Sequence, residues 1–267
     1  VRTLCVDRAG VVWAGTIGAG ATRFAPDGPR TFTTRDGLPN DTVVALAPHP
    51  EGGVWVGTAG GGLARIVDGA VTTAGRPDLP TGQVSALLVD DEGSLWVGTW
   101  GRGVCLVSGD RVACQSALAG NLPSDHVWSL FQDQERSVWI GTWTDGIVRL
   151  RHGVFANVGR REGLAGENVR AIAQDASGAI WASIATGGLA RLSGGSIRTY
   201  HTGDGLPSDQ PSALLPARDG RLWVGTYTDG LAVGVDGRFA RVPLPPPDWA
   251  SRDVRALAED EDGSIWV

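Results

Sequence analysis

The sequence predicts an all-β fold, a β-propeller of four-stranded blades, and three observations support this prediction. Seven of the eleven tryptophans recur at spacings of 41 to 43 residues. A similar phrase, such as GGVWVGT or GSLWVGT, surrounds each of them. Glycine makes up 40 of the 267 residues, as expected for a chain rich in tight turns. A repeat of about 40 to 50 residues that is built from short strands is typical of a propeller, in which each repeat forms one blade.

The repeat pattern also predicts the number of blades. Each recurring tryptophan lies twelve residues after the start of its repeat, and the repeats start near Val1, Val43, Val84, Val127, Val169, Pro211 and Val254. We therefore interpret residues 1–267 as a single propeller domain with six full blades and half of a seventh. The domain would have seven blades when complete, so we expect the chain to be a piece of a longer protein, with an unpaired strand edge at blade seven.

The strands and turns of a blade follow from the same pattern. In the second repeat, strands are expected at residues 43–46, 54–58, 63–67 and 70–73. Two-residue hairpin turns should join the last two strands of each blade, at Asp68-Gly69, Gly109-Asp110, His152-Gly153, Gly194-Gly195 and Asp236-Gly237. Between the first two strands lie Asp-x-x-Gly turns such as Asp90 to Gly93, which we interpret as turn formers and not as calcium ligands, because the clustered oxygens that calcium needs are missing.

The recurring tryptophans are interpreted as core residues. A bulky ring that returns once per blade fills the wedge between neighbouring blades, and the Gly-Thr that follows it lets two backbones approach closely. The structural positions are thus explained by the repeat, and functional candidates are residues that depart from it.

Composition and motifs exclude several classes of function. The net charge is 23 − 29 = −6 and no basic block is present, so the chain lacks the electrostatic signature of a nucleic-acid binder. No apolar run approaches the ~20 residues of a membrane helix, so no membrane contact is expected from this piece. The four histidines do not have the spacing of a metal site, and no nucleophile or phosphate-loop motif is found. We predict no metal, no cofactor and no catalytic residue.

Two longer segments carry a family resemblance. They read DGLPNDTVVALAPHPEGGVWVGTAGGGLARI and NLPSDHVWSLFQDQERSVWIGTWTDGIVRL, and they resemble the two-component regulator propeller repeat. The resemblance covers essentially the whole chain. The fifth repeat departs from the pattern with Ala182-Ser183-Ile184 after its tryptophan, and the second lacks the turn aspartate and has His49 nearby.

This resemblance implies a function. Proteins of this family are typically bacterial sensors, with propellers and an immunoglobulin-like module in the periplasm and a membrane helix that leads to a histidine kinase or another output domain. Their stimulus is often a glycan fragment. The chain would then be a periplasmic ligand-sensing propeller that binds a small molecule or an oligosaccharide, forms a dimer through adjacent domains, and is not itself an enzyme.

The first group of candidate ligand-binding residues lies in the loops between the second and third strands. These loops share a face with the loops between blades, where propeller ligands usually dock. Three of them carry an aromatic residue at the same place, and a charged residue lies two positions later in each: Trp100 with Arg102, Trp143 with Asp145, and Tyr227 with Asp229. Exposed rings beside charged groups suit the stacking of sugar rings. The alternative is that the rings cap the core.

A second group follows the valine that opens each blade. This position is occupied by Arg2, Val44, Ser85, Trp128, Arg170, Ser212 and Arg255, and it varies too much for a structural role. By the strand period of two it points away from the valine. Arg2, Trp128, Arg170 and Arg255 would form a basic, aromatic channel entrance for an anionic ligand, or would simply be solvated.

Two single residues complete the candidates. His126, beside Asp125, and Trp249, after Pro245-Pro246-Pro247, both fall in loops between blades, on the same expected face. His126 also supports an alternative function, because some propellers of similar repeat type, such as streptogramin lyase, carry out elimination chemistry with a histidine on this face. A third possibility is an interaction scaffold whose rings contact protein.

The cysteines give a hint about the compartment. Counting outward from a hairpin turn at Gly109-Asp110 places Cys105 directly opposite Cys114 in a non-hydrogen-bonded pair, which suits a disulfide. A disulfide would fit an oxidising periplasm, but a reduced pair has the same sequence. Cys5 is expected to be a small core residue.

Overall fold

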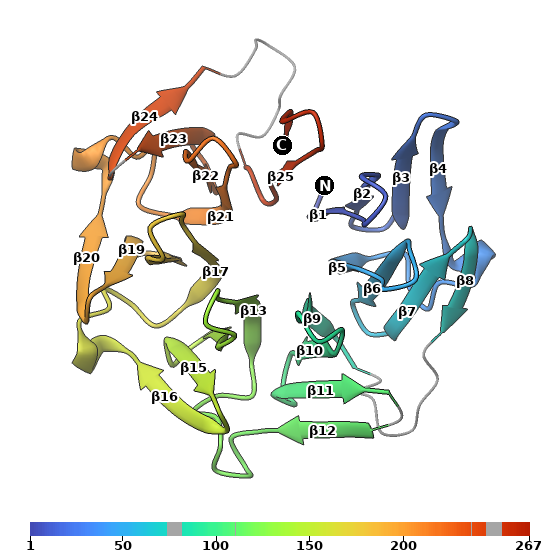
Figure 1. The fold of residues 1–267 in the computed structure, drawn as a ribbon, viewed down its shortest axis with the longest axis horizontal. Helices are drawn as coiled ribbons and strands as arrows, with labels where there is room; N and C mark the ends of the chain where they lie inside the picture. Colours follow the sequence, from blue (N-terminus) through green and yellow to red (C-terminus); the bar gives the residue numbers. More distant parts are fainter. Residues whose placement is uncertain (74–81, 110, 236, 244–252) are drawn as a thin grey trace. The chain divides into compact units, whose positions relative to one another are not determined.

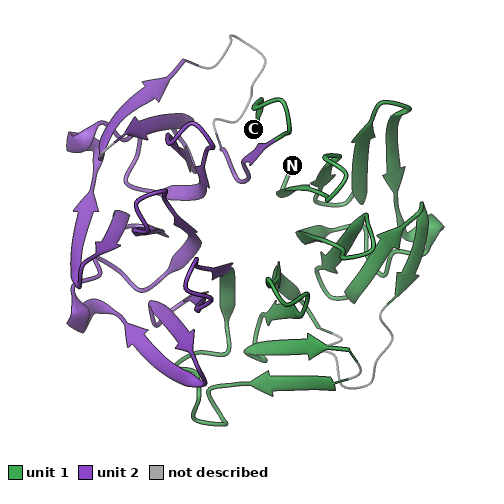
Figure 2. Cartoon of the chain, viewed as in Figure 1, with its two compact units in different colours: residues 1–130, 260–266 green, residues 131–259, 267 purple. Residues whose placement is uncertain are grey.

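The computed structural model describes residues 1–73, 82–109, 111–235, 237–243 and 253–267 (Figure 1). The chain forms two compact units, residues 1–130 with 260–266 and residues 131–259 with 267 (Figure 2).

Six four-stranded sheets follow one another along the chain, and each is an antiparallel meander of consecutive strands. Blades 1 to 3 lie in the first unit. Blade 1 contains β1 (Thr3–Val6), β2 (Val12–Gly15), β3 (Ala21–Ala25) and β4 (Gly28–Phe32), and blade 2 contains β5 (Val43–Pro48), β6 (Val54–Thr58), β7 (Gly62–Val67) and β8 (Ala70–Thr73). Blade 3 contains β9 (Val84–Val89), β10 (Leu95–Thr99), β11 (Val104–Ser108) and β12 (Arg111–Gln115). Blade 4 contains β13 (Val127–Gln132), β14 (Val138–Thr142), β15 (Ile147–Arg151) and β16 (Val154–Val158). Blade 5 contains β17 (Val169–Gln174), β18 (Ile180–Ile184), β19 (Gly188–Ser193) and β20 (Ser196–Tyr200). Blade 6 contains β21 (Pro211–Pro216), β22 (Leu222–Thr226), β23 (Leu231–Val235) and β24 (Arg238–Val242).

The described residues thus contain six complete blades, and not seven. After blade 6, β25 (Ala258–Glu259) and β26 (Ile265–Trp266) pair as a two-stranded sheet. The predicted strands of the second repeat are close to the observed ones. The strand expected at 43–46 continues to Pro48, because the turn begins only at His49, whose N–H bonds to the Gly53 carbonyl.

The hairpin turns between the last two strands form as predicted in blade 2. Val67 pairs with Ala70, and the two turn residues Asp68 and Gly69 both have positive φ, 50° and 74°. This is the conformation that a two-residue hairpin turn requires and that Asp-Gly favours. Asp110 and Asp236, in two other predicted turns, lie outside the described residues.

Three short 3₁₀ helices precede blades 2, 5 and 6. They are η1 (Thr34–Asp36), η2 (Arg160–Glu162) and η3 (Thr202–Asp204), and each ends at a glycine with positive φ.

The turn aspartates have a second role that the sequence reasoning missed. In blade 4, Oδ1 of Asp133 accepts a hydrogen bond from the N–H of Ser137, and Oδ2 accepts one from Nε1 of Trp139 at 2.7 Å. The same bond to the blade's tryptophan joins Asp7 to Trp13, Asp90 to Trp96, Asp175 to Trp181 and Asp260 to Trp266. One carboxylate therefore holds both the turn and the ring of the adjacent core.

The core prediction holds for four of the seven recurring tryptophans: Trp13, Trp96, Trp139 and Trp181 are buried, whereas Trp55, Trp223 and Trp266 are partly exposed. Trp139 is buried, and it belongs to a cluster with Val169 and Ile172 of the next blade. The glycine of the repeated phrase allows the close approach of two blades: a Cβ on Gly57 would lie 2.5 Å from Cγ1 of Val84. The ring and the glycine thus set the contact between neighbouring blades.

The cysteine register agrees with the count from the turn. Cys105 pairs with Cys114 across β11 and β12, and their sulfur atoms are joined in a disulfide. Cys5 is buried in the core, and burial, assisted by the charge of Asp7, raises the pKa of its thiol to about 12.

Candidate ligand-binding site

Among the described residues, the position after the first residue of a blade is a β-bulge in four blades. The register shifts between Val43 and Ala45, and again between Val169 and Ala171. The corresponding shifts in the other two blades bypass Ser85 and Ser212. A bulge leaves one residue unpaired and redirects its side chain. The variable position predicted from the sequence therefore coincides with a backbone irregularity. The alternation of side chains along a regular strand does not describe where its side chain points.

The small residues at this position link neighbouring blades. The hydroxyl of Ser85 donates to the carbonyl of Val127, and the hydroxyl of Ser212 donates to that of Val254, both at 2.5 Å. The acceptor in each case is the opening valine of the following repeat. The expectation that this position has no structural role is therefore wrong for the two serines, and the large residues at the same position are the better candidates for binding.

In the first unit, four predicted residues come together. The ring of Trp100 lies 4.9 Å from that of His126 and 5.3 Å from that of Trp128, edge to face in both contacts. The guanidinium of Arg2 lies 5.7 Å from the centre of the Trp128 ring. All four side chains are partly exposed. We call Arg2, Trp100, His126 and Trp128 the aromatic cluster.

In the second unit, two arginines contact one tyrosine. The guanidinium of Arg170 lies 4.0 Å from the centre of the Tyr227 ring, and that of Arg255 lies 4.9 Å from it. Arg255 also donates from Nε to Asp253 at 2.7 Å. We call Arg170, Tyr227, Asp253 and Arg255 the arginine cluster.

Burial and charge change the pKa values of both arginines. Desolvation lowers the pKa of Arg170; Tyr227 and Asp253 oppose this shift, and the nearby charge of Arg255 adds to it. Desolvation also acts on Arg255, but its hydrogen bond to Asp253 and its interaction with Tyr227 outweigh it and raise the pKa. Both guanidinium groups contact the same tyrosine ring, and Asp253 hydrogen-bonds to Arg255.

The remaining candidates are more dispersed. Arg102 is exposed, as is Trp143. Asp145 and Asp229 accept hydrogen bonds from the hydroxyls of the threonines that precede them, which indicates a role in their turns. Trp100 and Trp143 lie in different units, so the predicted surface formed by these two rings together stays a prediction. Trp249 lies outside the described residues.

A cavity of about 740 Å³ lies in the second unit, among residues that are not candidates from the sequence. It is lined by the first turns of blades 4 and 5 and by the last hairpin of blade 5, and its volume is in the range of ligand pockets. Its residues come from two neighbouring blades, so no motif within a single repeat marks it. Apolar side chains such as Leu192 and Ile197 contribute to its lining.

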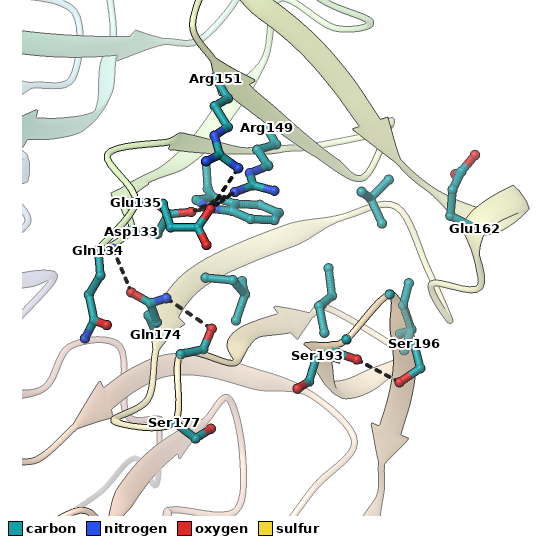
Figure 3. A pocket seen from close by; sticks show the side chains of 18 residues that line it. Asp133, Gln134, Glu135, Arg149, Arg151, Glu162, Gln174, Ser177, Ser193 and Ser196 are labelled. Atoms are coloured by element: carbon teal, nitrogen blue, oxygen red, sulfur yellow. Dashed lines mark hydrogen bonds and ion pairs between the residues drawn. The ribbon is translucent and has the colours of Figure 1, made fainter.

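Four of the five charged side chains that line this cavity are paired with one another. Figure 3 shows Arg149 and Arg151 directed toward Glu135. Glu135 lies 2.9 Å from each guanidinium, and Arg149 lies 3.6 Å from Asp133. Arg149 and Arg151 are therefore balanced by Asp133 and Glu135, while Glu162, which also lines the cavity, accepts a hydrogen bond from the N–H of Gly159.

Two further observations limit the chemistry of the described residues. No group of three or more His, Cys, Asp or Glu side chains there could hold a metal ion. Within the same part of the chain, no helix is long and apolar enough to cross a membrane.

The sequence matches a known family model. The family described as "Two component regulator propeller" matches residues 37–60, 78–101, 121–144 and 205–228. No curated protein matches the chain.

Solved structures share the fold. An extracellular domain assigned to the hybrid two component system BT3049 from B. thetaiotaomicron is 21% identical, with a TM-score of 0.84 over 99% of this chain, which spans 37% of that domain's chain. A streptogramin B lyase is 16% identical, with a TM-score of 0.80 over 99% of this chain and 89% of its own. Virginiamycin B lyase from Staphylococcus aureus is also 16% identical, with a TM-score of 0.78 over 99% of this chain and 90% of its own. At these identities the likeness establishes the fold, a β-propeller.

Proposed function

The repeats of this chain belong to the two component regulator propeller family, and from this premise we propose that the chain is the ligand-sensing propeller of an extracytoplasmic signalling protein. The repeat match is the observation that carries the proposal. The likeness to an extracellular two-component domain supports it. A seven-bladed domain belongs to the proposal as well, because β25 and β26 repeat the pairing that opens a blade.

The ligand is proposed to be a neutral glycan fragment that binds at the aromatic cluster. Trp100 and Trp128 are partly exposed and lie edge to face, which offers two differently oriented rings to a sugar. Aromatic rings contribute large apolar contact areas at little cost in conformational entropy. Arg2 and His126 add donors beside the rings for sugar hydroxyls.

The periplasm is the proposed compartment. The Cys105–Cys114 disulfide supports it, because disulfides persist in oxidising compartments such as the bacterial periplasm. Binding would shift the arrangement of a dimer formed through adjacent domains, and the output reaction would take place elsewhere in the protein.

Binding of neutral oligosaccharides tests this proposal. We expect at least one member of a broad oligosaccharide panel to raise the melting temperature of the chain, and its Kd to be measurable by calorimetry. Trp100→Ala and Trp128→Ala should each weaken that binding about tenfold, which corresponds to about 1.4 kcal/mol. Leu118→Ala is the control, because Leu118 is 97% exposed in the same unit and its truncation should leave the Kd unchanged.

A panel in which no sugar binds would contradict direct glycan sensing. If the tryptophan variants instead lose a protein partner while sugar binding stays absent, the cluster is a protein-interaction surface and the chain is a scaffold.

A second candidate function is a lyase, favoured by the shared fold with streptogramin B lyase and by the place of His126 beside Trp100. It predicts that the chain linearises a streptogramin B and that His126→Ala abolishes this activity. The sensor proposal predicts no turnover by either protein.

A further inference from the structure

The second unit contains two places where a pair of arginines meets carboxylates, and they differ in charge balance. At the cavity of Figure 3, Arg149 and Arg151 face Asp133 and Glu135, two charges against two. In the arginine cluster, Asp253 lies 2.7 Å from Arg255 and its charge also acts on Arg170, so the charge of these three side chains is 2 − 1 = +1. The excess charge is notable in a chain whose net charge is −6.

The guanidinium of Arg170 has donors that no described group satisfies. Its Nε and Nη1 are buried, and neither has a hydrogen-bond partner among the described residues. A buried donor without an acceptor destabilises the fold, and more strongly when the group is charged. The face of Tyr227 stabilises the cation but accepts none of these N–H bonds.

A monovalent anion would supply what the cluster lacks. It would accept hydrogen bonds from Arg170, balance the single excess charge and reduce the repulsion between Arg170 and Arg255. A carboxylate meets these conditions, since it carries one negative charge and two oxygens that suit a planar guanidinium. A doubly charged phosphate would exceed the balance and meet the carboxylate of Asp253.

We propose that the arginine cluster, Arg170 and Arg255 around Tyr227, is a binding site for the carboxylate of a small organic acid. The bulge at Arg170 is what directs this side chain to Tyr227. The site lies wholly in the second unit, and the proposal does not depend on sugar binding at the aromatic cluster of the first unit.

The two tyrosines of the chain make a sharp test possible. Fluorotyrosine labelling would give two ¹⁹F signals, and Tyr227→Phe assigns them. Glucuronate is the probe, and glucose is its matched neutral control. We expect glucuronate to shift the Tyr227 signal in a saturable way and glucose to leave it in place. Tyr200, buried against Trp181 in the same unit, is the internal reference and should not move.

Variants locate the site. Arg170→Gln and Arg255→Gln should each weaken glucuronate binding at least about tenfold, the effect of losing a charged hydrogen bond. Arg221→Gln is the matched control, because Arg221 also contacts an aromatic ring, that of Trp223, but is paired with Asp219. Should Arg170→Gln unfold the chain, Arg170→Lys, which keeps the charge, is expected to bind with intermediate affinity.

Three outcomes would overturn the assignment: equal shifts with glucuronate and glucose, glucuronate binding that Arg170→Gln and Arg255→Gln leave intact, or a Tyr227 signal that responds to inorganic phosphate and not to glucuronate. The last would indicate a site for a different oxyanion. Neutral oligosaccharide binding that depends on Trp100 would survive each of these results, so the two proposals fail separately.

Discussion

In blade 5, the first turn carries Asp175, whose Oδ2 accepts a hydrogen bond from Nε1 of Trp181 at 2.7 Å, whereas blade 6 has Ala217 at the corresponding position. Nε1 of Trp223 in blade 6 is buried and has no partner among the described residues. Blade 6 does keep an arginine on its tryptophan ring, since Arg221 lies 5.3 Å from the centre of the Trp223 ring.

The difference between the two blades shows which sequence position lets a carboxylate bind the indole N–H. In blade 6 the aspartate is two positions later, at Asp219, and it bonds to the side chain of Arg221 instead of the indole. A carboxylate six residues before the tryptophan reaches both the turn and the ring, and one four residues before it does not. Blade 6 thus keeps its fold but leaves one indole donor unsatisfied.

Removing the carboxylate from blade 5 should have the largest effect. Asp175→Ala removes the acceptor for Trp181 and for the N–H groups of Ser177 and Ala179. Because Asp175 is partly exposed, we expect a loss of about 2 kcal/mol in the free energy of unfolding, toward the middle of the range for such donors. Urea denaturation measures it. Asp175→Asn keeps one oxygen and should lose less, and an unchanged stability of Asp175→Ala would contradict the role of this carboxylate.

Introducing the carboxylate into blade 6 should raise the free energy of unfolding, by less than its removal from blade 5 lowers it. Ala217→Asp would place an acceptor near the buried Nε1 of Trp223, with a gain of about 1 kcal/mol, the net value of a typical hydrogen bond. Burial of the new carboxylate limits this gain. Ala217→Asn tests whether the hydrogen bond or the charge matters. A variant that is less stable than the parent would show that the turn of blade 6 cannot hold a side chain at this position.

Much of the fold could be predicted because the same tryptophan spacing and the same turn residues recur in successive repeats. The Trp13, Trp55 and Trp96 spacing gives the blades, and Asp68-Gly69 gives a hairpin turn whose φ angles the structure reproduces. These features depend on residues close in sequence. The Asp133–Trp139 hydrogen bond was missed because it crosses a turn, although the six-residue spacing recurs in five repeats and could have revealed it.

The sites were harder to predict, for a physical reason. The bulge that carries Arg170 is occupied by valine or serine in other blades, so no residue type marks it. The sequence did select Arg170 and Arg255 as a basic group, but their contact with Tyr227 joins residues of three different repeats. The cavity beside Glu135 depends on how neighbouring blades pack, which a single repeat does not encode.

The smallest expected effect is a pH dependence of stability in blade 2. This blade has His49 at the position where blade 5 has Asp175. His49 is buried, its ring lies 4.8 Å from that of Trp55, and its Nδ1 accepts the N–H of Glu51, which requires the neutral form. Burial lowers the pKa of His49 below its ordinary value of 6.5; Glu51 opposes the shift, and Arg65 and Arg8 add to it.

The sign of the pH dependence follows from this shift. Below pH 6.5 the unfolded chain binds a proton at His49 that the folded chain does not, so stability should fall as the pH drops through 6.5 and level off below the folded pKa. His49→Asp should remove this part of the pH dependence, and the difference between the two proteins isolates it, since His126, His152 and His201 are present in both. Urea titrations at pH 8, 7, 6 and 5 measure it. Parallel curves for the two proteins would mean that His49 is protonated equally in the folded and unfolded states, which would contradict the lowered pKa.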